Sequence, residues 1–156
     1  MIIKIRRMKS DDKAPVMKLL NSIPEFMTSE VTVAEEVIDT YLAGAGDYII
    51  SVAEISSNLV GYICYGRTPI TESTWDVYWM AVLPDKQNQG VGRLLLASAE
   101  EEISKARGRL IIIETSSKPE YENTRQFHLH RGYRESCRIS DFYAPGDSKN
   151  IYIKEI

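Results

Sequence analysis

The residues with the clearest capacity for chemistry lie between a predicted strand and a predicted helix. The stretch Val77–Leu96 reads VYWMAVLPDKQNQGVGRLLL, so an apolar run ends at Pro84 and two glycines, Gly90 and Gly92, open an apolar helical segment. The first backbone N–H groups of a helix have no intrahelical acceptor, and the helix dipole favours negative charge at that end. The spacing therefore predicts an anion site for a ligand that carries phosphate.

Length and composition are typical of one folded domain. The chain has 156 residues, 44% hydrophobic and 26% charged, which is enough to bury a core, and it is interpreted as a single domain over residues 1–156. Its formal net charge of -3 does not favour a nucleic-acid partner. No apolar run reaches the ~20 residues that cross a bilayer, and the N-terminus does not resemble a signal peptide. We therefore expect a cytoplasmic protein without membrane contact.

The cysteines and histidines predict neither a metal centre nor a disulfide. Cys64 and Cys137 are far apart and lack ligand spacing, and no cysteine or carboxylate cluster accompanies His128 and His130. We expect no bound metal and two reduced, buried thiols.

These residues must be positioned by a sheet with helices packed on it. Runs rich in β-branched and aromatic residues predict strands at 2–7, 48–55, 59–67, 75–83, 110–113, 134–143 and 151–156. Capping residues and helical spacing predict four helices, the first after the cap cluster 10–12 and the others over 32–43, 90–106 and 123–131. The continuous apolar run at 110–113 indicates a central strand covered on both faces. The order β-α-α-β-β-β-α-β-α-β-β predicts an α/β fold with a mixed sheet.

This element order, with a glycine turn after the fourth strand, resembles the GNAT superfamily of acyl-CoA-dependent N-acetyltransferases. The segment 87–92, QNQGVG, is similar to the family's Gln/Arg-x-x-Gly-x-Gly/Ala signature, and it follows MAVLP and precedes an apolar helix. The resemblance implies acetyl-CoA as the donor and a central sheet whose fourth and fifth strands splay apart. It implies that the pyrophosphate of coenzyme A is held by Gln87, Asn88, Gln89, Gly90, Val91, Gly92 and Arg93, and that the pantetheine arm pairs with Met80, Ala81 and Val82. The alternative is a plain strand-to-helix connection whose glycines only permit a tight turn.

A carboxylate at the end of the fifth strand is the candidate general base. Glu114 follows the apolar run 110–113, and its position is similar to the glutamate that N-terminal acetyltransferases of this family use to deprotonate the amine. An ordinary carboxylate is a weak base for an ammonium group, so burial or a water relay would have to assist it. The alternative is that Glu114 pairs with a nearby cation or only ends the strand.

The candidate proton donor departs from the family pattern. The segment 124–133, TRQFHLHRGY, matches Ala-x-x-Phe/Leu-Tyr-x-x-x-Gly-Phe/Tyr, and the family's frequent tyrosine falls on His128. A histidine can protonate a leaving thiolate. The alternative is a helix histidine that only contacts the coenzyme or packs beneath it. The family's frequent asparagine falls on Tyr121, with Asn123 close by, so the resemblance places Tyr121, Asn123 and His128 at the coenzyme. A phenol, Tyr121 or Tyr143, is the alternative acid.

The C-terminal hairpin and the turn between the first two helices are the expected walls of an acceptor site. The run 141–147, DFYAPGD, is similar to the hairpin of N-terminal and ribosomal-protein acetyltransferases, where tyrosines such as Tyr143 clamp the amino end of a substrate. The leading prediction is an enzyme, monomeric or homodimeric, that transfers acetyl from acetyl-CoA to a protein N-terminus, a lysine or a small amine by direct attack. The alternative is a non-catalytic acyl-CoA-binding module.

Overall fold

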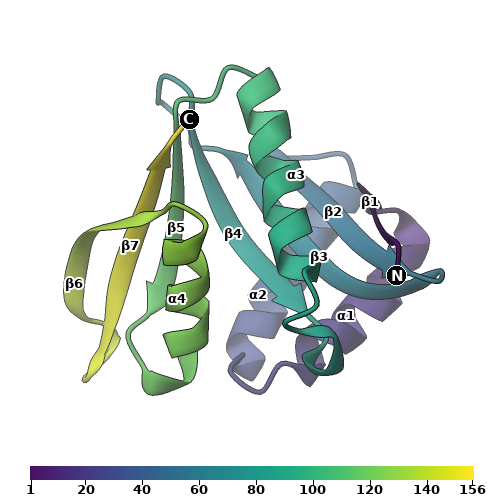
Figure 1. The fold of residues 1–156 in the computed structure, drawn as a ribbon, viewed down its shortest axis with the longest axis horizontal. Coiled ribbons are helices and arrows are strands. Elements are labelled where there is room, and N and C mark those ends of the chain that lie inside the picture. The colour runs from purple at the N-terminus through teal and green to yellow at the C-terminus, as the bar shows by residue number, and fades with distance from the viewer.

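The protein is built on one seven-stranded mixed sheet. The computed structural model describes residues 1–156, and the strands follow the order β1-β2-β3-β4-β5-β7-β6 (Figure 1). The strands are β1 (Ile3–Arg7), β2 (Tyr48–Ile55), β3 (Asn58–Arg67), β4 (Thr74–Val82), β5 (Leu110–Ser116), β6 (Arg134–Ala144) and β7 (Asp147–Glu155). The helices are α1 (Lys13–Ser22), α2 (Thr28–Leu42), α3 (Val91–Lys105) and α4 (Glu122–His130). This is the predicted order of elements, so the α/β fold class is confirmed.

Two helices cover each face of the sheet. Helices α3 and α4 lie on the front face in Figure 1, and α1 and α2 lie behind β2, β3 and β4. The apolar side chains of α3 recur at helical spacing and pack into the front core, which explains why this segment is an amphipathic helix. Its buried residues are Val91, Leu95, Leu96, Ala99 and Ile103. The rear face of β5, β7 and β6 has no helix over it.

The central strands separate at one end, as the family resemblance implied. β4 and β5 pair in parallel only from Thr74 with Leu110 to Val77 with Ile113. Beyond these residues β4 continues to Val82 and β5 to Ser116 without pairing to each other. The splay leaves backbone groups on one edge of each strand free to bind a ligand.

A β-bulge in β4 coincides with the start of this opening. Cys64 of β3 is opposite Trp79 and Tyr65 is opposite Val77, so Tyr78 has no partner on β3. A bulge bends a strand and increases its local twist. The bulge therefore helps to turn β4 away from β5.

The structure corrects several sequence-based boundaries. Helix α2 begins at Thr28 rather than at residue 32, because the Glu30 carboxylate accepts the Met27 N–H and caps a helix start four residues earlier. The last strand begins at Asp147 rather than 151, because it pairs with β5 and β6 as far as the hairpin turn.

Two burial predictions are also corrected. Ile111 and Ile113 are buried, but Leu110 and Ile112 are only partly buried, so β5 is not covered equally on both faces. Of the two free thiols, Cys64 is buried as predicted, whereas Cys137 is exposed. The reason is that β6 is an edge strand exposed along its whole length.

No helix of this chain is both long enough and apolar enough to cross a lipid bilayer.

Candidate active site

The glycine loop forms the start of α3 with the geometry that an anion site requires. Gly90 is the N-cap of α3 and has a φ of 89°, a left-handed conformation that residues with a Cβ rarely adopt. The Gly90 carbonyl accepts the Leu94 N–H at 3.1 Å, which leaves the preceding helical N–H groups without intrahelical partners. The side chains of Gln87 and Gln89 donate to the backbone carbonyls of Val82 and Asp85, at 3.2 and 2.9 Å. These two glutamines therefore brace the loop.

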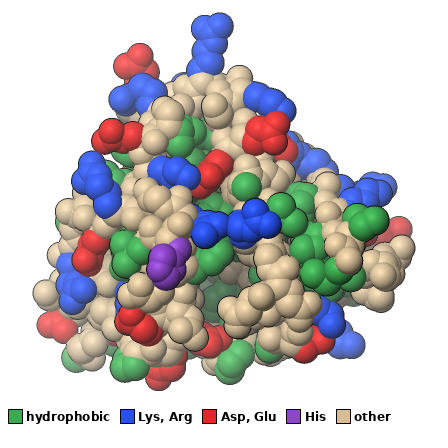
Figure 2. Space-filling view, viewed as in Figure 1, with side chains coloured by type: hydrophobic (Ala, Val, Ile, Leu, Met, Phe, Trp, Pro, Cys, Tyr) green, Lys and Arg blue, Asp and Glu red, His purple; other side chains and the backbone are tan.

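The second glycine keeps a groove open between α3 and α4. A Cβ built on Gly92 would lie 3.6 Å from the ring of Phe127 on α4 and 3.8 Å from Val82 on β4. The space next to Gly92 therefore lies between the Phe127 ring of α4 and Val82 of β4, and a side chain at position 92 would occupy it. Figure 2, in the view of Figure 1, shows a hollow between α4 and the start of α3.

Basic side chains gather beside this groove. A cavity of about 290 Å³ between α3, the end of α4 and β7 is lined by three cations, Arg93, Arg131 and Lys154, and by one carboxylate, Glu100. The Arg93 guanidinium also reaches back to the loop, since one of its nitrogens would lie 3.8 Å from a Cβ at Gly90. Lys and Arg side chains cross the middle of the same face in Figure 2. This local excess of positive charge is notable in a chain with a net charge of -3, and it suits phosphate groups.

The free edge of β4 runs from the bulge to the loop. Ala81 is buried, and Met80 and Val82 are half-buried. All three pair with β3 on one side and have no strand on the other. Their backbone groups can therefore bind an extended, amide-containing ligand in the manner of an added strand.

Glu114 lies on the rear face of β5, just past the point where β5 leaves β4. Its side chain is 44% exposed, and its Oε2 pairs with Lys149 Nζ of β7 at 2.8 Å. The carboxylate is thus reachable from solvent and is not buried in an apolar pocket. Of the two ways in which Glu114 could act as a base, burial is absent, and a water relay remains.

Tyr143 and its neighbour Phe142 form an aromatic wall next to Glu114. Their rings meet edge to face with centroids 5.0 Å apart, and Lys149 Nζ lies 4.1 Å above the Phe142 ring. Partial burial, with the charge of Glu114 as the next largest cause, raises the pKa of Tyr143 to about 12. The phenol is therefore protonated at neutral pH and can donate a proton.

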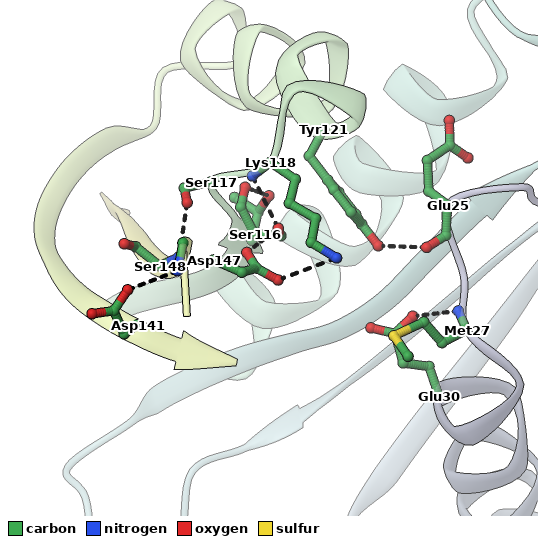
Figure 3. Close-up of polar contacts among 12 residues, drawn as sticks. Glu25, Met27, Glu30, Ser116, Ser117, Lys118, Tyr121, Asp141, Asp147 and Ser148 are labelled. Atoms are coloured by element: carbon green, nitrogen blue, oxygen red, sulfur yellow. Dashed lines mark hydrogen bonds and ion pairs between the residues drawn. The ribbon is translucent and has the colours of Figure 1, made fainter. Parts of the chain in front are cut away.

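Tyr121 connects the segment after β5 to the turn between α1 and α2. Its hydroxyl donates to the carbonyl oxygen of Glu25, in the turn between α1 and α2, at 3.0 Å (Figure 3). Burial, followed by the charges of Glu30 and Glu25, holds the pKa of Tyr121 well above its ordinary value. Asn123, in the first turn of α4, is exposed.

Comparison with known proteins identifies the family to which this chain belongs. The family model described as acetyltransferase (GNAT) domain matches residues 46–135, which include β4, the glycine loop, α3, β5 and α4. This chain belongs to the GNAT acetyltransferase family. A search of curated proteins gives no match.

Solved structures of GNAT proteins share the whole fold with this chain. A protein assigned to the GNAT acetyltransferases from Desulfovibrio desulfuricans is 36% identical, with a TM-score of 0.94 over 99% of each chain. The ribosomal-protein-S18-alanine N-acetyltransferase of Escherichia coli is 18% identical, with a TM-score of 0.79 over 99% of this chain and 94% of that one. The PaiA N-acetyltransferase of Thermoplasma acidophilum, solved with coenzyme A, is 15% identical, with a TM-score of 0.76 over the full length of both. The last two likenesses concern the fold alone.

In this GNAT chain, His128 is a nearly buried residue of the front core. It is 4% exposed, and its ring lies 6.0 Å from the Tyr133 ring and 6.2 Å from the Tyr152 ring, between centroids. Its Nδ1 has no hydrogen-bond partner. Burial lowers the pKa of His128 to about 4, so the imidazole is neutral at physiological pH.

This burial predicts an acid sensitivity of the fold. Because the pKa of folded His128 is about 4 and that of an exposed histidine about 6.5, the unfolded chain takes up the proton first as pH falls. Protonation of His128 in the unfolded chain should therefore lower the free energy of unfolding by about 2 kcal/mol between pH 7 and pH 5. In denaturant titrations at pH 7 and pH 5, the free energy of unfolding of His128→Phe should differ less between the two pH values than that of the wild type. The exposed His130→Gln should behave like the wild type, and an equal dependence in both variants would contradict the assignment.

Several polar residues of the site have no local signal in the sequence. Arg131 and Lys154 are separated by 23 positions and meet only because β7 returns beside the end of α4, where Lys154 Nζ donates to the Arg131 carbonyl at 2.9 Å. Asp147 is predicted from its neighbours only as a turn residue, yet it is buried at the start of β7.

Proposed function

We propose that this GNAT acetyltransferase transfers the acetyl group of acetyl-CoA to a primary amine that attacks the bound thioester directly. The observation that carries the proposal is the opening between β4 and β5. The helix-start cradle and Arg93 lie at one side of it, and Glu114, Tyr121 and Tyr143 lie at the other. One opening thus joins a site for the phosphates of a donor to a polar, aromatic site for an acceptor.

The residues at the helix start suit coenzyme A. We propose that the backbone of residues 87–93 binds the pyrophosphate, and that Arg93 and the neighbouring basic cavity add charge. The groove that a Cβ at Gly92 would fill supports this fit, because a phosphate must approach the backbone closely there. The free edge of Met80, Ala81 and Val82 would then bind the amide groups of the pantetheine arm, with Tyr121, Asn123 and His128 on the neighbouring wall. Acetyl-CoA supplies the thioester when bound.

Glu114 and the phenols supply the proton transfers that the reaction needs. The attacking amine must lose a proton, and the departing thiolate must gain one. We assign the first step to Glu114 acting through a water molecule, since its carboxylate is exposed to solvent and lies beside Lys149. We assign the second to a phenol, and Tyr143 is the better candidate because the Tyr121 hydroxyl is engaged with Glu25.

His128 fits packing better than proton donation. A nearly buried, neutral imidazole in contact with aromatic rings supports the groove from beneath. His128→Phe should therefore keep coenzyme affinity and turnover close to those of the wild type. A large loss of turnover at unchanged coenzyme affinity would restore the acid role.

The second candidate function is a coenzyme-binding module without catalysis. It is favoured by His128, which is buried and stands where the family frequently has a tyrosine. Thiol release from acetyl-CoA across amines and peptides separates the two. Release that depends on an amine supports the enzyme, whereas tight coenzyme binding with no release on any amine supports the module.

A further inference from the structure

Asp147 is a buried carboxylate with one uncommitted oxygen. Its side chain is only 9% exposed, although it begins β7 next to the hairpin turn. The hydroxyl of Ser116, at the end of β5, donates to Asp147 Oδ1. No protein group donates a hydrogen bond to Oδ2, whose nearest cation is Lys118 Nζ at 3.9 Å. Asp147 Oδ2 has no hydrogen-bond donor and is not fully enclosed, so an incoming donor can reach it.

Lys118 holds its place beside Asp147 only loosely. Its side chain is 45% exposed, and 3.9 Å is too long for a hydrogen bond. Exposed lysines in such pairs gain little from them, because a long side chain loses entropy when it is held. Lys118 is therefore a cation that an incoming ammonium group can displace.

The position of Asp147 relative to Glu114 follows from strand geometry. Ser116 lies two residues beyond Glu114 on the same face of β5, so the two Cα atoms are about 7 Å apart. The Ser116 hydroxyl fixes Asp147 at the far end of this interval. The Asp147 carboxylate is thus held beyond Glu114, on the face of β5 that carries both Glu114 and Ser116.

The surroundings of Asp147 belong to the same opening. The charge of Asp147 acts on the phenols of Tyr121 and Tyr143, and so does that of Glu30 from the start of α2. Figure 3 shows Glu30 and Glu25 on one side and Asp147, Lys118 and Tyr121 on the other. Two phenols and carboxylates from both walls form surroundings in which a cation is stabilised.

We propose that Asp147 binds a second cationic group of the acceptor, so that the preferred substrate is a primary amine that carries another positive charge. This inference rests on the proposed acetyl transfer and specifies its acceptor. Asp147 acts on specificity, since the reacting amine is served by Glu114 and the second ammonium group replaces Lys118 at Oδ2.

The test compares 1,4-diaminobutane with butan-1-amine, which has the same chain and lacks the second charge. The wild type should acetylate the diamine with a kcat/KM at least tenfold higher, mainly through a lower KM. Asp147→Asn keeps an oxygen for the Ser116 hydroxyl and should reduce this preference to threefold or less, with the KM for acetyl-CoA unchanged. Lys118→Gln should lower the KM for the diamine and leave that for butan-1-amine unaltered. Glu135→Gln, on the edge strand β6, is the matched control and should keep the preference.

The outcomes separate this inference from the proposed function. Equal kcat/KM for the two amines, or a preference that survives Asp147→Asn, would overturn the role of Asp147 while acetyl transfer stands. No turnover of any amine by the wild type would overturn both. The dipeptides Ala-Lys and Ala-Gln tell whether the second charge can come from a peptide side chain, and a preference for Ala-Lys that Asp147→Asn removes supports the same role.

Discussion

Gly92→Val should weaken coenzyme A binding at least tenfold while the protein remains folded. The position lies in the first turn of α3, and its open face is directed at Phe127 and Val82. A branched side chain there would keep a phosphate from reaching the helix-start N–H groups. Hydrogen bonds to charged groups contribute about 1.5–3 kcal/mol each, so the loss of one corresponds to roughly a tenfold to hundredfold change in Kd. Calorimetric titration with coenzyme A measures it.

Two control variants separate this effect from folding. Gly92→Ala should raise the unfolding free energy by about 0.5–1 kcal/mol, because alanine favours helices and its Cβ would meet Phe127 at an ordinary 3.6 Å. Its coenzyme affinity should still fall, though less than for valine. Ser104→Val introduces the same branched residue at an exposed position near the end of α3 and should leave affinity unchanged. Wild-type affinity in a folded Gly92→Val protein would show that the loop is not the phosphate site.

Glu114→Gln should lower kcat/KM for amine acetylation by about 10²–10⁴, the usual contribution of a positioned general base. The amide retains the shape of the side chain and can still accept a hydrogen bond from Lys149, but it cannot take up the proton of the amine. Coenzyme affinity should remain at the wild-type value, because the proposed site places Glu114 beside the acceptor and away from the coenzyme phosphates. Steady-state kinetics with thiol detection, together with calorimetry, separate the two effects.

The matched control for this prediction is Glu120→Gln, which removes an exposed carboxylate from the connection between β5 and α4. It should leave the rate within about twofold of the wild type, as surface charges contribute little. Full activity in Glu114→Gln would show that Glu114 is not the general base and that its role is the ion pair with Lys149.

Local patterns were sufficient to predict most of the fold. The β-branched and aromatic runs at 48–55 and 59–67, the glycine at 90 and the apolar spacing of α3 are determined by neighbours a few residues apart. The start of α2 was predicted four residues late, because the cap at Met27 has no typical capping side chain and depends on Glu30. The exposure of Cys137 was missed because a strand's place at the edge of a sheet depends on the order in which all strands assemble.

The sequence alone determined the order of elements, the glycine-rich helix start and the family. These features depend on backbone preferences and on apolar periodicity over a few turns or strands. Only the tertiary structure decided which polar groups meet. Ser116 and Asp147 are 31 residues apart in the sequence and meet because β5 pairs with β7. Tyr121 and Glu25 are 96 residues apart and meet because the segment after β5 lies against the turn between α1 and α2. Burial of His128 has the same origin, since long-range packing sets how much water a side chain keeps and hence whether it can exchange protons.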